Sequence, residues 1–171
     1  MHFNELISIM KKVILLCGGN KGNRAYYMDS ARRMIEQAIG KILQVSAIYE
    51  SAPWGFQAEQ NFYNQVVVVE TRLAPMAILK KIWEIEKKLG RIRVGNQYSS
   101  RTIDIDILFY EQEIIDTPDL VVPHPQLHQR RFTLTPLAEI LPDWIHPKFN
   151  QSISVLLKQC TDSSSVEVIK P

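Results

Sequence analysis

Apolar residues fall along the chain in short runs or at helical spacing, and glycine, proline or polar residues separate these segments. Residues 13–17 form a continuous apolar run followed by a glycine-rich segment at 18–22, which predicts a buried strand leading into a tight turn. From position 27 to 38 apolar residues recur every three or four positions, and Gly40 follows. This spacing predicts an amphipathic helix, and we expect Asn23 to cap it.

The middle of the chain predicts an antiparallel pair of strands and a second helix. Residues 42–50 and Phe62–Thr71 are rich in residues that favour strands, and the segment at 51–61 is predicted to be a long loop between them. Pro75 suits the first turn of a helix, and Gly90 suits its end. Four apolar residues mark one face of this helix: Ile78, Ile82, Ile85 and Leu89.

A further strand is predicted at residues 103–110, and two proline-rich, partly helical segments follow it. The order βαββαβ matches the ferredoxin-like arrangement, so we expect an α+β fold in which an antiparallel sheet carries helices on one face, with C-terminal additions. We expect a single domain at residues 12–160, an N-terminal extension at 1–11 and a polar tail at 161–171, whose serine run is typical of a frayed end.

Composition narrows the class of protein. The 171 residues are 46% hydrophobic and 22% charged, as in globular domains that bury a core without metal or disulfides. A net charge of +2 argues against long nucleic acid as a partner, and we find neither a signal peptide nor a membrane-spanning run. Cys17 and Cys160 lack the spacing of a zinc site or a disulfide framework. We therefore expect a cytoplasmic protein, and we expect it to be a monomer.

The sharpest local signal is a pair of aspartates in the strand predicted at 103–110. Alternate residues of a strand share a face, so Asp104 and Asp106 lie together opposite the isoleucines, with Cα atoms about 7 Å apart. Two carboxylates at this spacing repel each other unless a cation lies beside them, and Mg²⁺ is the divalent ion that we favour. The alternative is an ordinary half-buried strand whose polar face meets solvent.

The segments on either side of this strand, residues 88–102 and 120–138, are basic and contain no acidic residue. Their arginines are Arg91, Arg93, Arg101, Arg130 and Arg131. Arginines beside paired aspartates indicate a metal-bound polyphosphate, because guanidinium groups bind oxygen anions bidentately; the alternative is a solvated surface run. The sequence has neither a P-loop nor a dinucleotide-binding fingerprint, so we interpret the segment at 18–22 as a turn and assign it no phosphate contacts.

A second group of residues favours a flat heterocycle. Phe62 and Asn64 share a face of their predicted strand, and a ring beside an amide suits a planar ligand with hydrogen-bonding edges. Trp54 and Phe132 would add walls, although aromatic residues also serve as ordinary core packing.

Two single residues remain open on the sequence alone. His124 lies between two prolines, where it either aims at a phosphate or is merely structural. Glu86 lies at the edge of the apolar face of its helix, and we interpret it as a boundary charge rather than a site residue.

At these positions the chain resembles the hydroxymethyl-dihydropterin pyrophosphokinase family, which transfers a pyrophosphoryl group from ATP to a pterin alcohol in folate biosynthesis. The likeness covers nearly the whole of residues 12–160. Its specific elements are RTIDIDIL at 101–108 and VPHPQLHQRRF at 122–132. Weaker elements lie at 15–22, at 46–55 (SAIYESAPWG), at 62–64 and at 90–93.

The resemblance implies an ATP- and Mg²⁺-dependent diphosphotransferase in which one group of residues binds the nucleotide and another binds the pterin. Asp104 and Asp106 would hold two magnesium ions and, with Arg91 and Arg93, form the catalytic group. The nucleotide would be bound by Glu86, Arg93, Tyr98, Arg101, Ile107, His124 and Arg130. The pterin would be bound by Ser51, Ala52, Trp54, Phe62, Asn64 and Phe132.

The expected reaction needs position and charge neutralisation rather than a covalent nucleophile. The pterin hydroxyl would attack the β-phosphorus, AMP would depart, and Asp106 or solvent would receive the proton. We expect the loops at 51–61 and 91–100 to close over ATP.

This chain departs from the family pattern at four positions. Gln97 and Ser100 stand where many members have arginine and proline, Phe62 replaces a tyrosine found in some members, and Asp119 stands where some have a basic ATP contact.

Two other functions use some of the same residues. A two-metal phosphodiesterase or nuclease would use the aspartates but lacks a third acidic ligand nearby. A ferredoxin-like RNA-binding module would carry aromatic RNP motifs, which we do not find.

Overall fold

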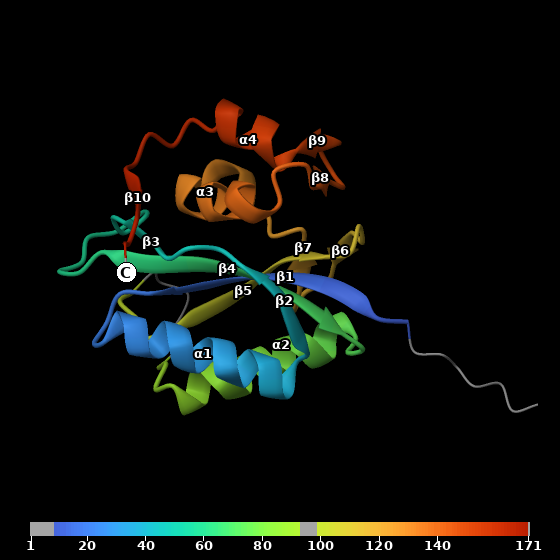
Figure 1. Cartoon of the computed structure of the whole chain (residues 1–171), viewed down its shortest axis with the longest axis horizontal. Helices are drawn as coiled ribbons and strands as arrows, with labels where there is room; N and C mark the ends of the chain where they lie inside the picture. The colour runs from blue at the N-terminus through green and yellow to red at the C-terminus, as the bar shows by residue number, and fades with distance from the viewer. Residues whose placement is uncertain (1–8, 93–98, 171) are drawn as a thin grey trace, which may run out of the picture.

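The computed structural model describes residues 9–92 and 99–170, which form an α+β fold (Figure 1). The elements that build its main sheet and the helices between them are β1 (Lys11–Gly19), α1 (Arg24–Ala38), β2 (Lys41–Val45), β3 (Tyr49–Ser51), β4 (Phe62–Thr71), α2 (Pro75–Lys88) and β5 (Asp104–Tyr110). The later elements are β6 (Ile115–Asp116), β7 (Val121–Val122), a 3₁₀ turn (Leu127–Gln129), α3 (Arg131–Ile140), β8 (Ile145–His146), β9 (Gln151–Ser152), α4 (Ile153–Gln159) and β10 (Val166–Val168).

The main sheet has six strands in the order β10-β3-β4-β1-β5, and β2 also pairs with β4. All of these pairings are antiparallel. With β2 and β3 counted as one strand, the order of the βαββαβ unit is that of a ferredoxin-like sheet, so the predicted fold class is confirmed. The sheet places β1 at its centre, between the strand that carries Phe62 and the strand that carries Asp104.

Helices cover both faces of the sheet, not one as we expected. α1 and α2 lie on one face, and α3 and α4 lie on the other (Figure 1). In β1, Val13 and Leu15 join the core beneath α1 and α2, whereas Ile14 and Leu16 join the core beneath α3 and α4. The apolar run at 13–17 is continuous because both faces of this strand are buried.

The strand predicted at 42–50 is two strands. β2 and β3 both pair with β4, and the segment between them contains the buried Ser46. The Ser46 hydroxyl accepts the N–H of Val66 at 3.0 Å, and the Ser46 carbonyl accepts the side-chain amide of Gln65 at 2.8 Å. Side-chain hydrogen bonds thus satisfy the backbone N–H of Val66 and the carbonyl of Ser46 at the point where the regular strand pairing is interrupted.

The glycine-rich segment at 18–22 is only partly the turn that we predicted. Gly18 and Gly19 belong to β1, and the turn begins at Asn20. A Cβ on Gly19 would lie 2.2 Å from the carbonyl oxygen of Thr102, so only glycine fits where this strand meets the segment that leads into β5.

The polar tail is not frayed at residues 166–168, because they form β10. This strand pairs with β3 and extends the main sheet at that edge.

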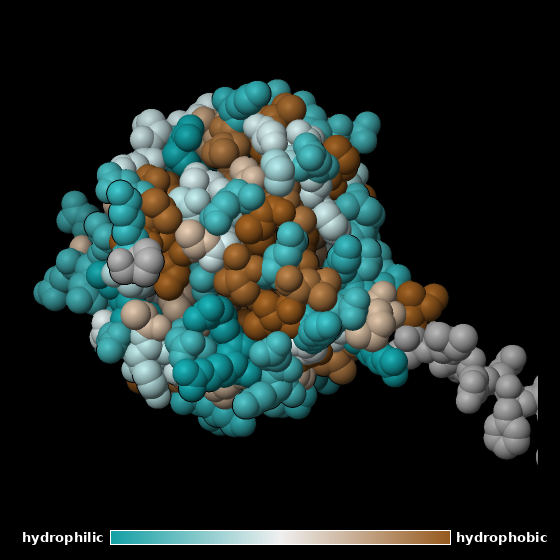
Figure 2. Space-filling model, viewed as in Figure 1, coloured by the Kyte–Doolittle hydropathy of each residue, from teal (hydrophilic) through white to brown (hydrophobic). Residues whose placement is uncertain are grey.

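Figure 2 shows the surface of the same face of the molecule, where hydrophobic side chains gather in patches among hydrophilic ones; one of these patches lies beside β10. Within the described ranges, no helix has the length and apolar character that a bilayer span requires.

Candidate active site

Two pockets of the described structure meet at Asp104 and Asp106, which line both of them. We call the first the aromatic pocket; its walls include Ser51, Ala52, Trp54, Phe56, Phe62, Asn64, Arg101, Arg130 and Phe132. We call the other the second pocket; its walls include Leu79, Trp83, Arg91, Ile107, Asp119, Leu120, Val121 and His124. The residues predicted for the pterin side thus gather in one pocket. Of those predicted for the nucleotide side, Ile107 and His124 line the second pocket, whereas Arg101 and Arg130 line the aromatic pocket and Glu86 lines neither.

Strand pairing builds the floor between the pockets. Gly18 of β1 lies opposite Asn64 of β4 and also opposite Asp104 of β5, so these three residues form one row across the sheet. A Cβ on Gly18 would lie 3.4 Å from Oδ1 of Asn64. The missing side chain leaves open space between the amide and the carboxylate, and Gly18 lines the aromatic pocket.

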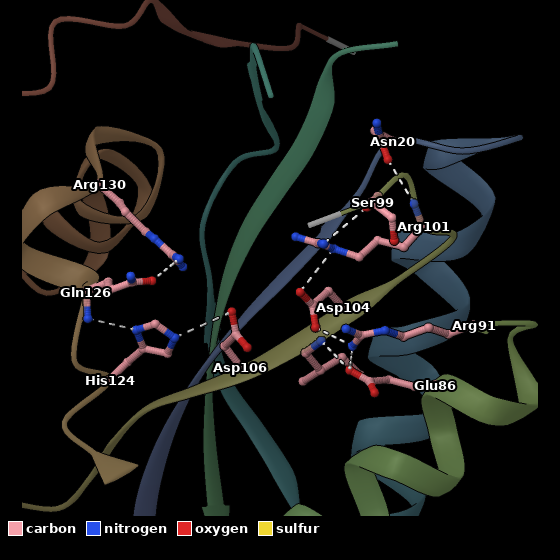
Figure 3. Close-up of polar contacts among 11 residues, drawn as sticks. Asn20, Glu86, Arg91, Ser99, Arg101, Asp104, Asp106, His124, Gln126 and Arg130 are labelled. Carbon is pink, nitrogen blue, oxygen red and sulfur yellow. Dashed lines mark hydrogen bonds and ion pairs between the residues drawn. The ribbon is translucent and has the colours of Figure 1, made fainter. Parts of the chain in front are cut away.

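The two aspartates share the face of β5 that the alternation predicted, and their neighbours differ (Figure 3). Asp104 pairs through Oδ1 with Nη1 of Arg91, and through Oδ2 with Nε of Arg101 at 3.1 Å. Asp106 faces the imidazole of His124, whose Nε2 lies 4.0 Å from Oδ2. Two arginines therefore neutralise Asp104, and a histidine borders Asp106.

Burial raises the pKa of Asp106 to about 7, and the negative charge of Asp104 adds to the shift, against the opposing charges of Arg130 and Arg101. Burial also lowers the pKa of His124 to about 4, with a further contribution from Arg130. The His124 imidazole is therefore neutral at pH 7. Its Nδ1 accepts the backbone N–H of Gln126 at 3.2 Å, so the proton lies on Nε2 and points toward Asp106.

Glu86 is buried, with an exposed fraction of 2%, so its interpretation as a boundary charge was wrong. One carboxylate oxygen accepts a hydrogen bond from Nη1 of Arg91 and another from the backbone N–H of Ile105, the latter at 2.9 Å. Arg91 in turn reaches Asp104, so α2 is joined to β5 through a chain of charges (Figure 3). The sequence pattern cannot reveal such a partner, since Arg91 lies in a loop beyond the helix.

The two arginines within the second specific motif, Arg130 and Arg131, lie in different environments. Arg130 lies in the wall of the aromatic pocket, with its guanidinium carbon 4.6 Å from the ring centre of Trp54, and it donates to the side chain of Gln126. Arg131 donates instead to the carbonyl oxygens of Cys160 and Asp162 in the C-terminal segment.

The aromatic pocket combines rings with a fixed amide. Asn64 is 2% exposed, and its Nδ2 donates to the hydroxyl of Ser51 at 2.8 Å, which fixes how the amide is presented. The ring of Phe56 meets that of Phe62 edge to face, with centroids 6.0 Å apart, and Arg101 lies 5.1 Å from the Phe62 centroid. A planar ligand with polar edges suits these walls.

Sequence reasoning missed several residues of the site. Phe56, Leu16 and Gly18 line the aromatic pocket, and Leu79 and Trp83 line the second pocket. The available signal was a tryptophan that falls outside the apolar face of the predicted helix, and the structure leaves Trp83 40% exposed. Of the predicted residues, Arg93 and Tyr98 lie outside the described ranges, as does Gln97.

Asn20 is a further buried residue that we had not assigned. Its side chain accepts the N–H of Arg101 at 3.0 Å and donates to the carbonyl of Gln60 and the hydroxyl of Ser100. It thereby joins the end of β1 to the loop before β4 and to the segment before β5 (Figure 3).

Oxygen donors at Asp104 and Asp106 suit a magnesium ion, which commonly takes one or two carboxylates from the protein and further oxygens from phosphate and water. No cluster of three or more His, Cys, Asp or Glu side chains suited to a metal occurs within residues 9–92 and 99–170. The donor set therefore fits a metal shared with a phosphate ligand rather than a site made wholly by the protein.

Comparison with known proteins agrees with this geometry. The family described as 7,8-dihydro-6-hydroxymethylpterin-pyrophosphokinase (HPPK) matches residues 14–142. The chain is 39% identical over 142 residues to a 2-amino-4-hydroxy-6-hydroxymethyldihydropteridine pyrophosphokinase of Porphyromonas gingivalis, with 81% of this chain and 96% of the relative covered. It is 41% identical over 144 residues to the protein of the same name from Aquifex aeolicus, with 84% and 89% covered.

Among solved structures, the Plasmodium falciparum HPPK-DHPS in a crystal structure with pteroate shares the fold, with a TM-score of 0.74 at 17% identity. The match covers 88% of this chain and 44% of that larger chain. The family match spans more than half of this chain, and the bacterial relatives align over most of their own length. The chain therefore belongs to the 7,8-dihydro-6-hydroxymethylpterin-pyrophosphokinase family.

Proposed function

We propose that this protein transfers the pyrophosphoryl group of ATP to 6-hydroxymethyl-7,8-dihydropterin, giving AMP and the pterin diphosphate in tetrahydrofolate biosynthesis. The observation that carries the proposal is the meeting of two unlike pockets at one pair of carboxylates. A transfer between two bound substrates needs such a shared boundary, and family membership supplies the substrates.

The aromatic pocket is proposed to bind the pterin. Phe62 and Phe132 offer ring faces to a flat heterocycle, and Asn64 and Ser51 offer donors and acceptors to its polar edge. Ala52 and Trp54 complete the wall next to Ser51. Buried amide groups favour a ligand that satisfies them, so this wall contributes to specificity as well as affinity.

The second pocket is proposed to bind ATP. Leu79, Trp83 and Ile107 supply apolar surface, and Arg91 and His124 lie where the pocket reaches the aspartates. The phosphates would thus point toward Asp104 and Asp106, with Arg101 and Arg130 on the far side. Arg93 and Tyr98 stay as proposed contacts on the strength of the family pattern. Asp119 lines this pocket and carries a charge opposite to that of a basic ATP contact.

Asp104 and Asp106 would hold two Mg²⁺ ions together with phosphate oxygens. The raised pKa of Asp106 supports this assignment, because it reflects a partly buried carboxylate near another negative charge, where a cation is favoured. When bound, the metal neutralises developing phosphate charge and holds the phosphate chain in place.

The chain's own residues would place the pterin hydroxyl in line with the β-phosphorus. A bond forms between the hydroxyl oxygen and that phosphorus, the bond from the phosphorus to the oxygen bridging to the α-phosphate breaks, and AMP leaves with the electron pair. Asp106 or water takes the hydroxyl proton. Arg101, Arg130 and the Nε2–H of His124 stabilise the transferring group. The loop at 51–61 closes to exclude water, and the second predicted loop, at 91–100, lies mostly outside the described residues.

We further propose that the protein acts as a monomer in the cytoplasm, with its catalytic domain at residues 12–160 and β10 of the tail adding an edge strand to the sheet of that domain. The two pockets are lined by side chains of one chain. Cys17 and Cys160 are both free thiols, which suits a reducing compartment.

One assay tests the reaction itself. The purified protein is incubated with ATP, MgCl₂ and the pterin alcohol, and the products are separated by chromatography. We expect AMP and the pterin diphosphate in equal amounts, with no product in the presence of excess EDTA. Formation of ADP or inorganic phosphate, or no turnover of the pterin, contradicts the proposal.

A further inference from the structure

The C-terminal segment at 160–169, which we call the strap, lies beyond the residues matched by the family and contacts α3 and β3, the two elements next to or within the walls of the aromatic pocket. It leaves α4, passes the beginning of α3 and ends beside β3 (Figure 1). Its composition is polar and serine-rich, and the sequence alone gave it no function.

One end of the strap holds the first residue of α3. The backbone N–H of Arg131 donates to Oδ2 of Asp162 at 3.0 Å, and its Nε donates to the carbonyl oxygen of Asp162 at 2.6 Å. Asp162 thus accepts an N–H from the first turn of a helix, where a negative charge is also favourable. Arg130 and Phe132, the two neighbours of Arg131, line the aromatic pocket.

The strap itself is held at this point by a compact turn. The N–H of Ser164 donates to Oδ1 of Asp162 at 3.0 Å, so both carboxylate oxygens are engaged. Partial burial opposes ionisation of Asp162, but the hydrogen bonds from Ser164 and Arg131 outweigh it and lower the pKa of this carboxyl. A charged, doubly bound Asp162 is a firm attachment for α3.

The other end of the strap holds β3. Val166 pairs with Ser51 and Val168 pairs with Tyr49, and the N–H of Ile169 donates to the carbonyl of Ile48 at 2.8 Å. Ser51 is the residue that fixes the amide of Asn64 in the pocket. β3 is three residues long, and without β10 it would be an exposed edge strand.

We propose that the strap is a positioning element that sets the distance between the Arg130–Phe132 wall and the Ser51–Asn64 wall, and so sets the affinity for the pterin. This inference rests on the proposed function. The second pocket is lined by α2, β5 and residues 119–124, whereas the strap bonds to α3 and β3. Loosening the strap is therefore expected to weaken pterin binding without a matching loss of ATP binding.

Two variants act on different ends of the strap. Asp162→Ala removes the carboxylate at α3, and a chain ending at residue 165 removes β10 but keeps Asp162. We expect each to raise the KM for the pterin by about tenfold, as for the loss of a charged or multiple hydrogen-bond contact, with the KM for ATP within about twofold of wild type. Asp162→Asn keeps an oxygen acceptor for Arg131 and should restore most of the pterin affinity.

Ser163→Ala is the matched control, since it alters the strap between its two attachments and should leave both KM values unchanged. All assays are run well below the unfolding midpoint of each variant. Equal rises in both KM values, a fall in kcat alone, or unchanged pterin KM in both strap variants would overturn the proposal. Inactive wild-type protein would instead contradict the proposed function, so the two failures are distinguishable.

Discussion

Asp104 is ion-paired through both of its carboxylate oxygens, to Arg91 and Arg101, whereas Asp106, two residues along the same face of β5, faces a neutral imidazole at 4.0 Å. The two residues predicted as equivalent metal ligands therefore have different surroundings. Removing the Asp104 carboxylate takes one ion-pair partner from each of two arginines, and removing the Asp106 carboxylate relieves the cost of a partly buried charge.

The first prediction separates activity from stability at these positions. Asp104→Asn and Asp106→Asn should each lower kcat by about 10³-fold or more, because each removes a carboxylate that neutralises charge through the metal. At pH 8 without metal, Asp104→Asn should lower the unfolding midpoint, and Asp106→Asn should raise it. Circular dichroism melts and steady-state kinetics measure both effects. Substantial turnover in either variant would remove that residue from the metal site.

The second prediction concerns pH. The pKa of Asp106 is raised to about 7 in the folded protein, whereas an ordinary aspartate in the unfolded chain titrates near 4. The contribution of neutral Asp106 to folding stability is therefore complete below about pH 4 and is lost as pH rises through 7. In EDTA, the melting temperature of wild type relative to Asp106→Asn should fall between pH 4 and pH 8. Mg²⁺ should reduce this fall, because it binds the ionised carboxylate. A difference that stays flat with pH contradicts the assigned shift.

The third prediction tests the buried link from α2 to β5. Arg91→Ala leaves Glu86 buried without its guanidinium and should destabilise the fold by about 3–5 kcal/mol in urea denaturation. The double variant Glu86→Gln/Arg91→Met should recover much of that stability without recovering kcat. Stability loss of the same size in the double variant would show that the pair is not coupled.

The fourth prediction tests the aromatic pocket. Phe62→Ala removes a ring from its wall and should raise the KM for the pterin by about tenfold, with the KM for ATP unchanged. Phe62→Tyr keeps the ring and is the matched control. A larger effect on ATP than on the pterin would show that the two pockets have been assigned the wrong way round.

Local periodicity predicted much of the fold and the centre of the site. The alternation of β5 placed Asp104 and Asp106 on one face, and the period of β4 placed Phe62 with Asn64, because both depend only on residues within one strand. The continuous apolar run at 13–17 predicted a buried strand, and the same run indicates a cover on both faces of the sheet rather than on one.

Contacts between distant segments could not be predicted in the same way. Glu86 is buried with its charge paired to Arg91 and with a hydrogen bond from the N–H of Ile105, and its helical position gives no sign of either partner. The strap is polar in sequence, and its strand exists because β3 offers a free edge. These features depend on tertiary partners, which composition and periodicity do not specify.

The paired state of Asp104 implies an exchange of counter-ions when ligands arrive. Arg91 and Arg101 form ion pairs with the carboxylate of Asp104, and the same guanidinium groups are suited to phosphate oxygens. If these groups transfer from Asp104 to the phosphates while the aspartate takes up Mg²⁺, positive and negative charges stay matched before and after binding. The site then buries no uncompensated charge when ligands bind. Much of the free-energy cost of removing Asp104 and the two arginines from water has already been met during folding.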